Sequence, residues 1–248
     1  MKTKFQGVTA ALTLLASAAV SLSVSGVARA STLVDGGFES QGAASNIPGS
    51  YCYGGAGSSG ENNCATGAWT FTTLVGGLVG DGMISQSTGG SPWNSSAWGA
   101  PIANDPSNYF AFVQINGSFS QAFTAIQTGT LSLDWIDAAR SPNPGGGYET
   151  YTVSVTGPTS TVIVGTYTPT NSAFEPVSSA SFSVIAGDSY TVTFQGVDPY
   201  PNYDRTAFID NVALTPLPST WTMLIAGFVG LGFFAYRGTK NSAATAAA

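Results

Sequence analysis

The sequence predicts that residues 31–215 form an all-β domain, an antiparallel β-sandwich. Three observations lead to this prediction. Short runs rich in Val, Tyr, Phe and Thr alternate with polar residues, and no convincing amphipathic helix interrupts them. The two flanking segments are apolar and carry basic residues, which is typical of targeting and membrane segments. Antiparallel sheets account for strands that are half-buried and have no helical crossover between them.

Ten segments are expected to form strands. The alternation is clearest over residues 151–156 and 190–195, where Val, Tyr and Phe occupy one face and Thr and Ser mostly the other. Asn116-Gly117 is typical of a hairpin turn between two candidates. The other candidates are 33–38, 69–74, 109–115, 118–126, 130–137, 161–168, 180–186 and 206–214. The residues expected in the core are Leu33, Phe38, Val153, Val155, Val192, Phe194, Phe208 and Val212.

Composition and charge exclude several functions. The chain has no histidine, which excludes Ser-His-Asp and Cys-His catalysis and imidazole metal sites. All 13 acidic residues but only two of the seven basic ones lie between residues 31 and 215, so this body has a net charge of −11. Such a body repels phosphate backbones, and we expect no nucleic-acid partner.

Residues 1–30 have the pattern of a secretory signal peptide. Lys2 and Lys4 precede an apolar stretch, and Ala28-Arg29-Ala30 forms a small-x-small cleavage site, so we expect cleavage after Ala30. The alternative is an uncleaved membrane anchor, but several serines dilute the short apolar run. Export favours a disulfide between Cys52 and Cys64, whereas two cysteines without histidine make a poor zinc site.

Residues 217–236 contain no charged residue and are long enough, at about 30 Å as a helix, to cross a bilayer core. Trp221 and Tyr236 stand at the two ends, where amphipathic rings favour the membrane interface. Arg237 and Lys240 favour the cytoplasmic side for their end, which places the sandwich outside. The sequence thus predicts a transmembrane helix and a short tail over 241–248; the alternative is a buried C-terminal core helix.

Residues 216–240 resemble the PEP-CTERM sorting signal, also described as an ice-binding-protein C-terminal type. The resemblance implies processing by an exosortase-type enzyme in a Gram-negative bacterium that makes exopolysaccharide. It further implies an intermediate anchored in the inner membrane and a final place at the cell surface or in the extracellular matrix. Leu217 replaces the family's central Glu, and a rival sortase signal would need Gly where Trp221 stands. The residues that carry the resemblance are Pro216, Pro218, Ser219, Thr220, Trp221 and Arg237.

A second resemblance covers most of the middle. The segments 33–39, 118–121 and 208–214 are similar to the opening, post-hairpin and closing segments of galactose-binding-like jelly rolls, which include many carbohydrate-binding modules. The resemblance implies a structural calcium held by Glu39 and Asp210, with Asp35 as a further oxygen ligand. The alternative is that these acids cap or end their strands. No other cofactor is expected.

Aromatic residues in loop-like stretches are the candidate ligand-binding residues. Flat rings stack on the apolar face of a sugar while neighbouring polar groups bind its hydroxyls. Trp135 belongs to an apolar alternation and is instead expected in the core. The candidates are Trp93, Trp98, Tyr148, Tyr200 and Tyr203.

No catalytic pair is visible, because Asp134 and Asp137 are three residues apart and face opposite sides of an extended strand. We therefore expect an exported protein that is not an enzyme and that works as a glycan-contacting or matrix-associated module, with extracellular polysaccharide and the membrane as its partners. Two alternatives stay open: a secreted hydrolase acting through carboxylates alone, and a structural surface protein with no specific ligand.

Overall fold

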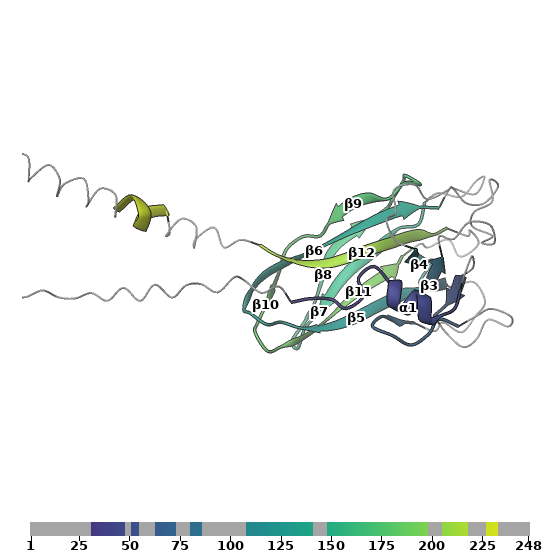
Figure 1. Cartoon of the computed structure of the whole chain (residues 1–248). Coiled ribbons are helices and arrows are strands. Elements are labelled where there is room, and N and C mark those ends of the chain that lie inside the picture. The colour runs from purple at the N-terminus through teal and green to yellow at the C-terminus, as the bar shows by residue number, and fades with distance from the viewer. Residues whose placement is uncertain are drawn as a thin grey trace, which may run out of the picture.

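The computed structural model describes residues 31–47, 51–54, 63–72, 80–85, 108–140, 148–197, 205–217 and 227–232. Within these ranges the chain forms two antiparallel sheets that lie against each other as a β-sandwich (Figure 1). Nine of the ten predicted segments contain a strand, so the predicted fold class is confirmed at the level of an antiparallel sandwich.

The larger sheet, sheet A, has seven strands. Six follow one another across the sheet in the order β1, β3, β4, β12, β6, β10, and β9 pairs with β6 outside this path. Their bounds are β1 (Tyr51–Tyr53), β3 (Gly80–Ser85), β4 (Tyr109–Gln114), β12 (Ala207–Pro216), β6 (Gly129–Ala139), β10 (Phe182–Val184) and β9 (Glu175–Ser178).

Sheet B has five strands in the order β2, β5, β11, β7, β8. Its inner face carries the apolar members of each alternation, because side chains along a strand point to opposite faces in turn. The bounds are β2 (Thr70–Phe71), β5 (Ser118–Thr124), β11 (Ser189–Gly196), β7 (Tyr151–Thr156) and β8 (Thr161–Tyr167).

The main core fills the space between the two sheets. Phe119 stacks on Phe194 with ring centroids 5.0 Å apart, and Trp135 meets Phe194 edge-on at 5.5 Å. Seven of the eight predicted core residues are buried, and Leu33 is half-buried. A second cluster includes Phe110, Phe112 and Phe208 on the outer face of sheet A. Sheet A is therefore buried on both faces in this region.

The strand predicted over residues 33–38 is wrong. Asp35 and Phe38 have φ angles of 54° and 58°, which an extended strand does not allow. The chain turns into helix α1 (Glu39–Ala44) instead, and the carboxylate of Asp35 accepts hydrogen bonds from the backbone N–H groups of Ser40 (3.0 Å) and Gln41 (2.8 Å). These amides would otherwise lack partners in the first turn, so Asp35 caps the helix.

The hairpin predicted at Asn116-Gly117 is also wrong, because the turn joins strands of different sheets. β4 pairs with β3 and β12, whereas β5 pairs with β2 and β11. The turn itself is tight, since the N–H of Gly117 donates to the carbonyl of Gln114 at 2.8 Å. A Cβ at Gly117 would lie 2.1 Å from the carbonyl oxygen of Gly80, so only glycine fits where the chain crosses β3.

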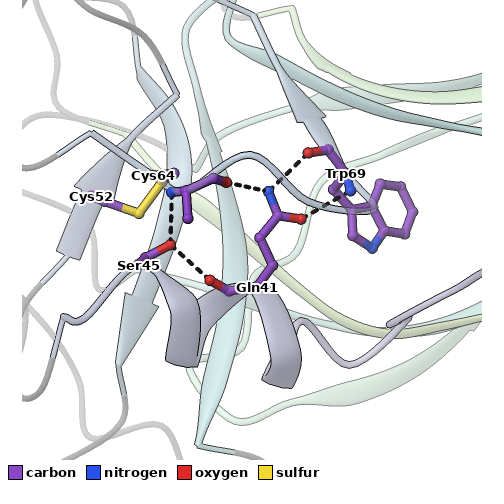
Figure 2. Close-up of a disulfide and its surroundings, with 6 residues drawn as sticks. Gln41, Ser45, Cys52, Cys64 and Trp69 are labelled. Carbon is purple, nitrogen blue, oxygen red and sulfur yellow. Dashed lines mark hydrogen bonds between the residues drawn. A yellow bond between two sulfur atoms is a disulfide. The ribbon is translucent and has the colours of Figure 1, made fainter.

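The predicted disulfide between Cys52 and Cys64 is confirmed, with Cα atoms 4.9 Å apart. Figure 2 shows how the side chain of Gln41 ties helix α1 to the segment that follows Cys64. Gln41 accepts from the N–H of Trp69 (2.9 Å) and donates to the carbonyls of Ala65 (2.8 Å) and Trp69 (2.9 Å). The amide thus satisfies three backbone groups, which fixes the opening of the sandwich beside the disulfide.

The predicted targeting segments lie largely outside the described residues. Residues 1–30, including Ala30, are not described, and neither are Pro218, Ser219, Thr220, Trp221 and Arg237. Pro216 ends β12, opposite Leu131 of β6. Residues 227–232 are helical, but none of the helices in the described ranges is long and apolar enough to cross a membrane.

We predict that replacing both cysteines by serine lowers the free energy of unfolding by about 3 kcal/mol, the usual effect of opening a loop of this length. Urea denaturation of the whole chain in mild detergent, followed by tryptophan fluorescence, measures this difference. Reducing the native protein should give the same loss. An unchanged free energy of unfolding would contradict the stabilising role of the disulfide.

Candidate functional site

A hollow of about 260 Å³ lies where strand β8 of sheet B meets β6 and β9 of sheet A. The segment that joins β8 to β9 forms one wall of this hollow. Acidic, amide, hydroxyl, aromatic and apolar side chains all contribute to the lining, which is the composition of a small-ligand site. The lining residues are Asp137, Tyr167, Thr168, Pro169, Thr170, Asn171, Glu175 and Val177.

Strand pairing brings two carboxylates together in the hollow. Asp137 of β6 lies directly opposite Glu175 of β9 in the antiparallel register, and Trp135 lies opposite Val177. Residues two apart on a strand share a face, so both acids lie on the face that carries Trp135. Asp137 is only 6% exposed, whereas Glu175 is exposed. The hollow therefore has one buried and one exposed carboxylate.

A buried chain of hydrogen bonds crosses from one sheet to the other and ends at Asp137. The indole N–H of Trp135 on β6 donates to the hydroxyl oxygen of Tyr151 on β7 at 2.8 Å. The Tyr151 hydroxyl in turn donates to Oδ2 of Asp137 at 2.5 Å. Because Tyr151 is fully buried, its hydroxyl would otherwise be left unsatisfied. These two hydrogen bonds thus fix the Asp137 carboxylate at the edge of the hollow.

The surroundings change the acidity of these groups. Burial raises the pKa of Asp137 to about 6; the hydrogen bond from Tyr151 lowers it, and the charge of Glu175 raises it further. Burial, together with the charge of Asp137, also raises the pKa of Tyr151 and of Tyr167 above that of an ordinary phenol. Asp137 is therefore mostly ionised at neutral pH, while both phenols keep their protons.

The wall of the hollow is held in place by Asn171 and Tyr167. The side-chain amide of Asn171 donates to Oε1 of Glu175 at 3.0 Å, and its backbone carbonyl accepts from the N–H of Ala139 at 2.6 Å. The ring of Tyr167 meets Trp135 edge-on with centroids 4.9 Å apart, and its hydroxyl donates to a β9 carbonyl. The wall is thus anchored to both sheets.

Of the ligand-binding residues predicted from the sequence, only Tyr148 lies within the described residues, and it is not among those that line the hollow. Trp93, Trp98, Tyr200 and Tyr203 lie outside the described residues, and their role stays a prediction. Tyr148 is half-buried just before β7. The prediction that Trp135 belongs to the core is confirmed.

The calcium ligands implied by the jelly-roll resemblance have other partners. Asp35 caps helix α1, and Oε1 of Glu39 accepts from the N–H groups of Asn108 (2.6 Å) and Tyr109 (3.0 Å). Asp210 is fully buried in β12. Across the ranges that the structure describes, no group of three or more acids or cysteines could hold a metal ion. The structural calcium stays an untested prediction.

Sequence reasoning missed Glu175, Asn171 and Tyr167 because no local pattern marks them. It placed Asp134 and Asp137 on opposite faces of one strand, and the structure agrees: Asp134 is bound by the hydroxyls of Ser178 and Thr215 on the other face. The sequence does contain one indication of Asp137. Asp137 follows Trp135 at the next inward-facing position of the alternation, so a carboxylate was to be expected on the inner face, where an unpartnered charge is costly.

Comparisons with known proteins concern the fold. No protein-family model and no curated protein matches the chain. The chain is similar to the CBM22-1 xylan-binding domain of Paenibacillus barcinonensis Xyn10C, with 10% identity and a TM-score of 0.42, over 77% of this chain and 97% of that one. It is similar to TmCBM61, solved with β-1,4-galactotriose, with 12% identity and a TM-score of 0.41, over 76% of this chain and 99% of that one.

A third similar structure is the CBM22-1 and GH10 portion of Clostridium thermocellum xylanase 10B, solved with xylohexaose. The identity is 10% and the TM-score 0.40, over 61% of this chain. The chain spans about a quarter (26%) of that xylanase chain. At these identities the ligand has to be argued from the chain's own residues.

A second buried carboxyl, Asp81 of β3, lies apart from the hollow. Asp81 is 3% exposed, and its Oδ2 has no hydrogen-bond partner within the described residues. A Cβ at Gly54 would lie 2.6 Å from this oxygen, so the neighbouring backbone closes over it. Burial raises the pKa of Asp81 to about 7, although a backbone hydrogen bond from Thr72 opposes this change. The folded protein therefore favours the protonated acid.

We predict that Asp81→Asn stabilises the protein at high pH and not at low pH. Because the folded pKa is about 7 and the unfolded pKa about 3.8, the native protein loses stability as pH rises between these values. An amide does not titrate, so the variant should be more stable by about 4 kcal/mol at about pH 8 and by less than about 1 kcal/mol at about pH 4. Urea denaturation at both pH values measures the difference, and an equal difference at both would contradict it.

Proposed function

We propose that this chain is an exported, non-catalytic protein of the bacterial envelope that contacts glycan through the hollow at Asp137, Tyr167, Asn171 and Glu175. The observation that carries the proposal is the convergence of fixed acceptors, an aromatic ring and apolar side chains on one small hollow. Sugars present hydroxyl donors around a ring with apolar faces, and such a lining complements both features.

The placement of the hollow supports action outside a membrane. Ser31 accepts a hydrogen bond from the N–H of Ile126, just after β5, and the N–H of Leu217 donates to the carbonyl of Thr130 near the start of β6. Both residues therefore lie at the end of the sandwich where β12 ends (Figure 1). Asp137 is seven residues farther along β6 than Thr130, which corresponds to about 23 Å. The hollow thus lies toward the opposite end of β6 from Leu217, where the predicted membrane segment over 217–236 begins.

One observation favours a second candidate, a carboxylate-dependent glycoside hydrolase. Residues directly opposite in an antiparallel pair have Cβ atoms about 4.5–5.5 Å apart, and retaining glycosidases place two carboxyl groups at a similar separation. Asp137 and Glu175 lie directly opposite each other in this way, so their carboxyl groups can come within the range of a retaining pair. We favour glycan contact without catalysis over hydrolysis, because contact requires only the hydrogen-bond acceptors and the aromatic ring that line the hollow.

We predict that the whole chain, in mild detergent, binds glycans weakly on an array that includes the host's exopolysaccharide. Asp137→Asn and Asn171→Ala should each weaken binding about tenfold, since each alters a charged or amide acceptor of the hollow. Asp134→Asn is the matched control, because it removes one charge from the opposite face of the same strand and should leave binding unchanged.

Other outcomes on the array separate the alternatives. Loss of binding only when Trp93, Trp98, Tyr148, Tyr200 or Tyr203 is changed to Ala would move the site to the loop aromatics. New reducing ends that form with the native chain and disappear with Glu175→Gln would establish the hydrolase. Binding to no glycan would leave a structural surface protein.

We also predict export with removal of residues 1–30 and anchoring through 217–236 before exosortase-type processing. Mass spectrometry of protein recovered from the envelope should find Ser31 at the N-terminus. A soluble cytoplasmic form that keeps residues 1–30 would contradict this route.

A further inference from the structure

Two carboxylates in the hollow repel each other, although the fold would be more stable without this repulsion. Asp137 and Glu175 are both acidic and lie directly opposite each other on neighbouring strands. Like charges in this position destabilise a sheet, and burial at Asp137 weakens solvent screening. A neutral residue at either position would remove the repulsion.

Among the described residues, no cation lines the hollow to balance these charges. The described residues that line it include two acids and neither Lys nor Arg. The groups that face Asp137 from the elements packed around it are the phenols of Tyr151 and Tyr167 and the carboxylate of Glu175. The negative charge of the whole body adds to the local field.

Each carboxylate keeps one oxygen that no described residue binds. Tyr151 donates to Oδ2 of Asp137, and Asn171 donates to Oε1 of Glu175. Oδ1 of Asp137 and Oε2 of Glu175 therefore remain as acceptors on two residues that line the same hollow. An ammonium group carries three donors and matches such a pair, whereas a single hydroxyl donates only one hydrogen bond.

We propose that the hollow selects a cationic sugar, a glycan unit whose free amine lies between Asp137 and Glu175. This inference rests on the glycan-contacting function proposed above and names its ligand class. The ring of Tyr167 offers a π-face or an apolar wall beside the cation, and Pro169 and Val177 contact the carbons of the sugar. At about 260 Å³ the hollow is smaller than the pockets that enclose drug-sized ligands, which fits one unit of a longer chain.

Calorimetric titration of the whole chain in mild detergent tests this selection with three β-1,4-linked tetrasaccharides, of glucosamine, of N-acetylglucosamine and of glucose. We expect the glucosamine tetrasaccharide to bind about tenfold more tightly than the other two, since the ammonium adds a charge-assisted hydrogen bond. Added salt should weaken only this preference.

Glu175→Gln should abolish the preference, so that the three tetrasaccharides bind with similar affinities. Its side chain is exposed, and the new amide oxygen can still accept from Asn171, so we expect the variant to fold. Asp188→Asn is the charge-matched control, because Asp188 lies in the turn between β10 and β11, away from the hollow, and its change should preserve the preference.

Four results would overturn the inference. Equal binding of all three tetrasaccharides would leave glycan contact intact and remove the selection for a cation, and an equal loss with Asp188→Asn would reduce the preference to overall charge. Binding of neutral tetrasaccharides that requires added Ca²⁺ and disappears with Glu175→Gln would make the pair a metal site. If no tetrasaccharide and no arrayed glycan binds, the proposed function fails as well.

Discussion

The hydrogen bond from Tyr151 to Asp137 is the interaction on which the hollow depends. Tyr151 belongs to sheet B and Asp137 to sheet A, so this bond links the two layers through their core. Without this hydrogen bond, the buried carboxylate of Asp137 would lack a partner, which is strongly destabilising. The buried hydroxyl of Tyr151 would also lose its acceptor. Because the indole of Trp135 donates to the same hydroxyl, the buried polar groups of all three residues have partners. The hydrogen bonds thus hold the Asp137 carboxylate at the edge of the core.

The chemistry of the hollow follows from this constraint together with strand register. β9 pairs with β6 so that Glu175 lies opposite Asp137, and the segment before it places Asn171 and Tyr167 around the same space. Rigid strands fix the two acids, while the wall is tied down by backbone hydrogen bonds. Sites built on regular elements hold their geometry more precisely than sites on loops. The same arrangement concentrates negative charge, on which the proposed selection of a cationic sugar rests.

The sequence predicts the sandwich and its core because local alternation determines which side chains face inward, as in Val153 and Phe194. The disulfide follows from having two cysteines in a chain that the sequence predicts to be exported. The site is different, since Asp137 and Glu175 are 38 positions apart and meet only through the register of an edge strand. The strand predicted over residues 33–38 is wrong for a local reason, because the carboxylate of Asp35 caps a helix there. Pairing between distant strands leaves no periodic signal in either of them.

The most direct test of the account is to map a bound oligosaccharide onto the chain by NMR, using ¹⁵N-labelled whole protein in micelles and the best ligand from the array. We expect shifts in the backbone signals of residues 167–177 and of Asp137, and a shift of the Trp135 indole N–H signal that is transmitted through Tyr151. Shifts confined to the segments around Trp93, Trp98, Tyr200 and Tyr203, with residues 167–177 unchanged, would contradict it.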